Sequence, residues 1–159
     1  MNKRALIKKI TARLTEELQV YFRAAQFSRA EATHESSKAE SKYDTRGLEA
    51  SYLARGQSKQ AAELEAAITE FEKLPLRKFG PDDPIHLGAL VELEVGGENL
   101  FYFIGPRAGG TEILHDKQEI LVITPQSPLG EQLIGQKQGA QPQLTLGGAK
   151  QAVKILKVV

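Results

Sequence analysis

Cysteine and tryptophan are both absent from this sequence of 159 residues. Without cysteine the chain has no disulfide, no thiolate metal site and no cysteine nucleophile, and this composition fits a reducing compartment. Long apolar runs are missing as well, because Lys8 and Lys9 interrupt the N-terminal segment and no stretch approaches the ~20 residues that span a bilayer. We therefore expect a soluble, cytoplasmic protein with no membrane partner.

An excess of charge of one sign is also lacking. The 21 Lys plus Arg and 20 Asp plus Glu leave a net charge of +1, so no global field draws the chain onto nucleic acid or an anionic membrane. The three histidines, His34, His86 and His115, make no recognisable metal-ligand spacing. Any electrostatic function must come from local patches.

Proline and glycine are scarce in the first half of the chain only. The first 74 residues contain no proline and two glycines, whereas all seven prolines follow from Pro75 onward. Proline cannot continue a helix, and this break in composition marks a domain boundary. We predict a helical domain over residues 1–74, a linker over 75–85 and a second domain over 86–159.

Two apolar stripes at steps of three and four residues run through the first domain, which predicts an antiparallel coiled-coil hairpin. The hairpin reverses near Thr33–Ser37, and Ser37 with Glu40 has the pattern of a capping box. Each arm of roughly 30 residues would be ~45 Å long at 1.5 Å per residue, which favours a protruding probe or clamp. The first stripe consists of Ile7, Ile10, Leu14, Leu18, Tyr21, Ala25 and Ser28, and the second of Tyr43, Gly47, Ala50, Ala54, Gln57, Ala61, Leu64, Ile68 and Phe71.

The second half changes to strand-length segments separated by glycine and proline. This pattern predicts a small, mostly antiparallel sheet, with a hairpin at Gly96-Gly97. Ser127-Pro128 begins a short helix that ends before Gly135, and this helix would cover one face of the sheet. The fold class is therefore α+β. The predicted strands are 86–95, 99–105, 119–124, 141–146 and 151–158.

Residues 123–137, with the sequence ITPQSPLGEQLIGQK, resemble the C-terminal domain of bacterial Gre-family transcript cleavage factors. In that family a strand leads to Ser-Pro-(Ile/Leu)-Gly. Gly88–Leu93 and Phe101–Pro106 occupy the places of a Gly-x-x-Val strand and of a strand ending in Val/Ile-Gly-Pro. Because a proline-free hairpin precedes them, the resemblance covers nearly the whole chain.

The resemblance implies an N-terminal coiled coil and a C-terminal FKBP-like domain that docks on RNA polymerase. The docking candidates are Ser127, Pro128, Leu129 and Gly130. The coil would enter the secondary channel of the polymerase and lie near the nascent RNA. Such a factor acts as a monomer through the polymerase active site, so we do not expect the chain to be an enzyme itself.

The predicted tip of the coil departs from the family pattern. Family members carry Asp-Leu-Ser-Glu-Asn-Ala-Glu-Tyr, whose two metal-holding carboxylates fall on Ser36 and Ala39 when Tyr43 is matched to the motif tyrosine. Serine and alanine do not hold Mg²⁺ strongly, so we expect no stably bound metal or cofactor. Glu35 and Glu40 are the candidate substitute carboxylates for Mg²⁺ shared with the polymerase, although a solvated turn acid at Glu35 and a capping-box partner at Glu40 explain them better.

Three basic residues lie near the predicted tip, and two other functions are alternatives to the Gre-type role. Lys38, Lys42 and Arg46 follow at steps of four near the tip, where they contact RNA phosphate or form a solvated helix face. We favour a regulator that tunes elongation with weak or no transcript cleavage. The alternatives are an FKBP-type peptidyl-prolyl isomerase, which needs an apolar aromatic cradle, and a coiled-coil adaptor or chaperone, which needs an apolar tip.

Overall fold

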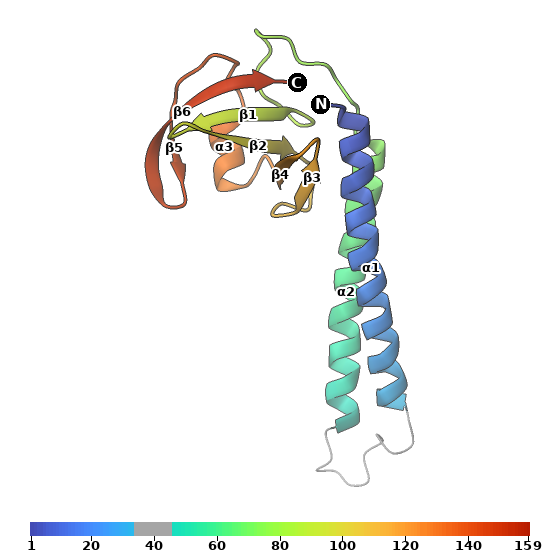
Figure 1. Ribbon diagram of the computed structural model, residues 1–159. Helices are drawn as coiled ribbons and strands as arrows, with labels where there is room; N and C mark the ends of the chain where they lie inside the picture. The colour runs from blue at the N-terminus through green and yellow to red at the C-terminus, as the bar shows by residue number, and fades with distance from the viewer. Residues whose placement is uncertain (34–45) are drawn as a thin grey trace. The chain divides into compact units, whose positions relative to one another are not determined.

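The computed structural model describes residues 1–33 and 46–159, the side chains of residues 25, 28–29, 31–33 and 46–58 excepted (Figure 1). Two long helices precede a sheet, α1 over Lys3–Thr33 and α2 over Arg46–Lys73. The Asn2 side chain caps α1 by accepting a hydrogen bond from the Ala5 amide at 3.2 Å. The predicted α+β fold class is confirmed, whereas the predicted capping box of Ser37 and Glu40 lies outside the described residues.

The chain forms two compact units. One contains Met1–Thr11 and Glu70–Val159, and the other contains Ala12–Thr69. The first and last turns of the helical hairpin therefore pack with the sheet. These units differ from the ranges 1–74, 75–85 and 86–159, which mark where the composition changes.

In the unit Ala12–Thr69, α1 and α2 run antiparallel beside each other (Figure 1). Leu14 and Ala61, each on one predicted stripe, are 1% and 2% exposed. The remaining described stripe positions in this unit, Leu18, Tyr21, Leu64 and Ile68, are half-buried. The stripes are thus confirmed where side chains are described. Ala67, which is also buried, lies beside the second stripe and was not predicted.

Six strands form one sheet in the described part of the chain, in the order β3-β4-β2-β1-β6-β5. Their pairs are antiparallel except β2 with β4, which run parallel. The prediction of a mostly antiparallel sheet is confirmed, but it missed β3 and the parallel pair. The strands are β1 Leu90–Val95, β2 Glu98–Ile104, β3 Glu112–His115, β4 Gln118–Ile123, β5 Gln143–Leu146 and β6 Ala149–Val158.

The two faces of the sheet are covered differently. On one face, Val91, Leu93 and Ile104 belong to a buried cluster that includes Leu133 of α3, the short helix Pro128–Leu133. On the other face, Phe103 stacks on Phe71 of α2 with ring centres 6.4 Å apart. The predicted short helix over one face is confirmed.

Gly105 lets the end of β2 approach the last turns of α2. A Cβ atom at this position would lie 2.8 Å from Cζ of Phe71 and 2.9 Å from Cγ1 of Val122. Any larger residue would push these side chains apart, because cores of this density have little free space. The glycine of the Ile-Gly-Pro motif is therefore a packing requirement in this chain.

Candidate functional site

The amine of Lys3 joins the start of α1 to three other parts of the sheet-containing unit. It donates hydrogen bonds to the carbonyl oxygens of Arg77, of Gly88 at 3.1 Å and of Val159 at 2.9 Å. Its Nζ also lies 4.8 Å from the centre of the Phe79 ring. Burial lowers the pKa of Lys3, and the positive charge of Arg77 lowers it further. Backbone oxygens and an aromatic face thus replace water around this cation.

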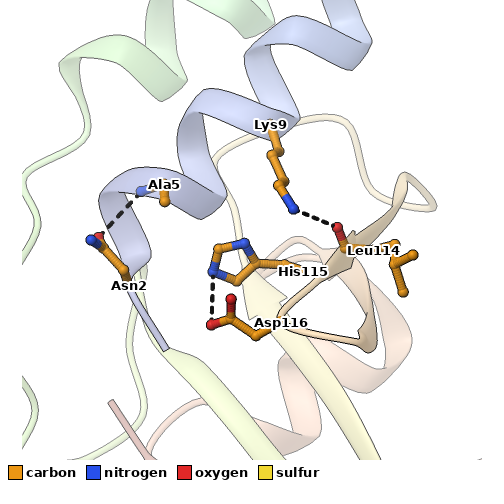
Figure 2. Close-up of polar contacts among 6 residues, drawn as sticks. All are labelled: Asn2, Ala5, Lys9, Leu114, His115 and Asp116. Atoms are coloured by element: carbon orange, nitrogen blue, oxygen red, sulfur yellow. Dashed lines mark hydrogen bonds and ion pairs between the residues drawn. The ribbon is translucent and has the colours of Figure 1, made fainter.

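A second contact joins α1 to the edge strand β3 (Figure 2). Nζ of Lys9 donates a hydrogen bond to the Leu114 carbonyl at 3.0 Å, while the Leu114 side chain points away from the helix. His115 is 3% exposed, and neither ring nitrogen has a hydrogen-bond partner among the described residues. Its Nε2 lies 3.4 Å from Oδ2 of Asp116. The strand therefore has one face buried near α1 and one open face.

The predicted docking turn is a tightly built entry to α3. The Ser127 hydroxyl donates to the Thr124 carbonyl at 2.7 Å and accepts from the Gly130 amide at 3.1 Å. A Cβ on Gly130 would lie 1.8 Å from the Thr124 oxygen, so only glycine fits there. Of the four docking candidates, Pro128 is exposed, Ser127 and Leu129 are half-buried, and Gly130 is buried. Ser127 and Gly130 therefore shape the turn, and Pro128 and Leu129 offer the accessible surface.

The aromatic residues of β2 do not gather into one cradle. Phe103 is fully buried on the side of Phe71, while Tyr102 is half-buried and packs against the core on the α3 side. Adjacent strand residues point to opposite faces, which separates these rings. Burial raises the pKa of Tyr102, so its hydroxyl keeps its proton well into the alkaline range. This arrangement lacks the aromatic cradle that the isomerase alternative needs.

The candidate residues of the coil tip lie outside the described residues. They are Glu35, Ser36, Lys38, Ala39, Glu40, Lys42 and Tyr43, and His34 lies there too. Arg46 is the first residue of α2, and its side chain is among those not described. The structure therefore does not report which of these side chains come together, and their roles stay predictions.

In residues 1–33 and 46–159 no group of three or more His, Asp or Glu side chains is placed to hold a metal ion. Neither long helix, within the same residues, is apolar enough to cross a bilayer.

Sequence reasoning missed Lys3 and Lys9 as residues that join α1 to the sheet-containing unit. The partners of the Lys3 amine are 74 to 156 positions away in the chain, and no local pattern reports such distances. An N-terminal lysine is far more often solvated than buried, so its residue type gave no signal either.

Comparison with known proteins finds no matching family model and no matching curated protein. Solved structures do align along the chain. A crystal structure of GreA factor homolog 1 (Gfh1) of Thermus thermophilus is 23% identical over 94% of both chains, with a TM-score of 0.39. Thermus aquaticus Gfh1 is 25% identical over 92% of both chains, with a TM-score of 0.41.

Proposed function

We propose that this chain is a Gre-type transcription regulator that binds RNA polymerase and places its helical hairpin in the secondary channel. The observation that carries the proposal is the succession of elements. Two helices of 31 and 28 residues precede the sheet, and the short helix α3 within the sheet domain begins at the motif Ser127-Pro128-Leu129-Gly130. This is the order of parts that the motif resemblance implies.

The dimensions of the helices suit a probe. At 1.5 Å per residue, a helix of 31 residues is ~46 Å long, which is about three times the radius of gyration expected for a compact domain as large as the whole chain. α1 ends at Thr33, and α2 begins at Arg46. Both residues are distant in sequence from the segments that pack with the sheet, which are Met1–Thr11 and the residues from Glu70 onward. A hairpin built in this way can carry its tip residues into a narrow channel.

The identity of the tip residues decides which chemistry the regulator supports. In the family the tip supplies carboxylates for a Mg²⁺ ion at the polymerase active site, where the metal activates water for RNA cleavage. Ser36 and Ala39 offer no carboxylate at the matched positions. We therefore propose a regulator that occupies the channel and tunes elongation, with weak cleavage at most through Glu35 and Glu40.

Transcript cleavage in backtracked complexes tests this chemistry. We expect wild type to stimulate cleavage weakly or not at all while changing the rate of elongation. If weak cleavage is present, Glu35→Gln with Glu40→Gln should abolish it, because the amides keep the size but lose the charge. Glu63→Gln with Glu65→Gln is the matched control, since both of these glutamates are exposed on α2 away from the tip.

The reciprocal variant adds acids at the matched positions. Ser36→Asp with Ala39→Glu should increase Mg²⁺-dependent cleavage above that of wild type, because both metal-holding carboxylates are restored. Strong cleavage by wild type that survives the double Gln change would contradict the proposed tip chemistry. Absence of any effect on elongation, together with no binding to polymerase, would contradict the proposed function itself.

One observation favours the adaptor as a second candidate. Val20, Phe22 and Phe27 of α1 are 62%, 43% and 71% exposed, which is unusual for residues of this size. An adaptor would use such side chains to grip a client helix. Val20→Thr with Phe27→Ser should abolish client binding in that case, but should leave elongation activity within twofold if the polymerase contacts lie at the tip and the sheet.

A further inference from the structure

A hollow lies among the start of α1, the end of α2 and the segment that follows α2, all within the sheet-containing unit. Its volume is about 520 Å³, which lies within the roughly 300–1,000 Å³ typical of small-molecule pockets. The hollow uses no residue of the predicted coil tip or of the docking turn. Its lining includes Arg4, Ile7 and Lys8 of α1, Phe71 and Glu72 of α2, and Leu76 of the following segment.

The walls of the hollow are fixed by contacts of their own. Phe71 is 1% exposed and stacks on Phe103. The segment after α2 is held by the Leu74 amide, which donates to the Phe71 carbonyl at 3.3 Å, and by the Arg77 carbonyl, which accepts from the Lys3 amine. A ligand that enters therefore loses little free energy to ordering the protein around it.

The four cations in the first seven residues of α1 fall into two pairs. Lys3 and Lys9 donate hydrogen bonds to backbone carbonyls. The side chains of Arg4 and Lys8 are exposed, and neither has an ion-pair or hydrogen-bond partner among the residues that the structure describes. They lie one helical turn apart, on the side of α1 that lines the hollow. Cations at a helix N-terminus oppose the macrodipole, so helix stability does not explain this second pair.

Acidic side chains are scarce around Arg4 and Lys8. The first acid of α1 is Glu16, and Glu72 is the one acid among the described residues that line the hollow. Glu72 is exposed and forms no ion pair with either cation within the described chain. The two cations are therefore available to an anion from outside the chain.

The rest of the lining is largely apolar. Leu76 is half-buried, and Ile7 and Phe71 are buried beside it. Two free cations next to an apolar wall complement a ligand that carries an anionic group on an apolar body. An anion without such a body would leave the apolar wall in water, and an apolar molecule without charge would leave the cations unpaired.

We propose that the hollow is a binding site for a small amphipathic anion, of which a medium-chain carboxylate is the simplest member. Arg4 and Lys8 hold the carboxylate, and Ile7 and Leu76 contact the apolar chain. A ligand in this place touches α1, α2 and the segment after α2 together, so its binding stabilises the folded chain. The inference goes beyond the proposed function, since the protein alone suffices to bind the ligand.

Calorimetric titration of the full-length protein with decanoate tests the site. We expect one decanoate per chain, with affinity that falls as salt concentration rises. Acetate carries the charge without the chain, and decanol carries the chain without the charge. Each of these should bind at least about tenfold more weakly than decanoate, because each satisfies only one part of the lining.

Three variants locate the site. Arg4→Gln with Lys8→Gln should weaken decanoate binding about tenfold or more, because both cations are lost. Glu72→Gln should strengthen it about two- to threefold, because the one acid of the lining no longer repels the carboxylate. Arg23→Gln with Lys59→Gln is the matched control and should stay within twofold, since it removes the same charge from exposed positions of the other unit.

The outcomes decide the inference without reference to polymerase. Absence of decanoate binding, or binding that the change at Arg4 and Lys8 leaves unaltered, overturns the site. Equal weakening by the control pair overturns it as well, because net charge alone would then explain the effect. Equal affinity for decanol overturns the anionic class of ligand.

Folding of each variant is checked by far-UV circular dichroism. If the variant at Arg4 and Lys8 does not fold, Glu72→Gln decides, since tighter decanoate binding supports the site and unchanged or weaker binding overturns it. Loss of the decanoate site leaves the proposed function standing, and failure to bind polymerase leaves the decanoate site standing.

Discussion

Two glycines beside Thr124 differ in how much space an added methyl group would have. A Cβ on Gly130 would lie 1.8 Å from the Thr124 carbonyl oxygen, whereas one on Gly109 would lie 3.5 Å from the Thr124 side chain in ordinary contact. The first position must move backbone atoms to accept alanine, and the second need not. The Ser-Pro-Leu-Gly motif therefore has a steric reason in this chain, whatever it binds.

Gly130→Ala should accordingly destabilise the protein by about 1–3 kcal/mol through overpacking. Gly109→Ala is the control and should change the free energy of unfolding by less than about 0.5 kcal/mol. Urea unfolding followed by circular dichroism measures both. Equal midpoints for the two variants would show that α3 is not held against Thr124 as described.

His115 is a second residue whose surroundings predict a measurable effect. Its ring is buried without a hydrogen-bond partner among the described residues, which costs free energy that an apolar side chain would not. His115→Leu should therefore leave stability unchanged or raise it by about 1 kcal/mol. A loss of more than about 1 kcal/mol in urea unfolding would show that the contact between Nε2 of His115 and Oδ2 of Asp116, at 3.4 Å, stabilises the fold.

At the scale of elements, α1 has one buried stripe and one open side. Leu14 is 1% exposed on the stripe, and Val20 is 62% exposed away from it. Leu14→Ala should cost about 2–5 kcal/mol, while Val20→Ala should stay within about 0.5 kcal/mol. Thermal unfolding of the two variants checks this, and a similar loss for both would mean that the stripe is not the packed side of the helix.

The elements that the sequence predicted correctly are those whose signals are local. The spacing of apolar residues predicts the two long helices. Gly96 and Gly97, with φ of 59° and 86°, form the predicted turn between β1 and β2, and Gly135 follows the end of α3 as predicted. The β3 strand was missed because its turn uses Asp116 and Lys117 with positive φ in place of glycine. The parallel pairing of β2 with β4 depends on contacts between distant segments, which no local pattern encodes.

The candidate site was predictable to a similar extent. The short helix beginning at Ser127-Pro128 was predicted from the proline, and the structure confirms it and shows Ser127 as its N-cap. Lys3 was not predictable, because its three carbonyl partners are assembled by the tertiary fold. The tip residues were singled out by matching Tyr43 to a family motif, and they stay predictions.

At the scale of the whole molecule, Lys3 joins the start of the chain to its end, because its amine donates a hydrogen bond to the Val159 carbonyl. Lys3→Met keeps the length of the side chain but removes three hydrogen bonds, so it should cost about 1–3 kcal/mol near pH 7. The pKa of Lys3 is lowered in the folded state from 10.5 in the unfolded chain. As pH rises toward 10.5, the unfolded chain binds more protons than the folded one, so wild type gains stability relative to the variant.

Urea unfolding of wild type and Lys3→Met across the alkaline range measures this difference. We expect the gap between them to widen as pH rises. A gap that narrows would mean that the folded state favours the charged amine, contrary to the burial of Lys3.

We propose that the hairpin tip reaches the active site of RNA polymerase, and crosslinking tests this most directly. Because the chain has no cysteine, Ser36→Cys provides a unique thiol at the predicted tip for a photoreactive crosslinker. Glu63→Cys places the same probe on an exposed position of α2 as a control. In complexes with core polymerase, the probe at position 36 is predicted to attach to segments surrounding the catalytic Mg²⁺, and the probe at position 63 to segments farther out. Adducts from position 36 on the outer surface of the polymerase, or none at all, would contradict the account.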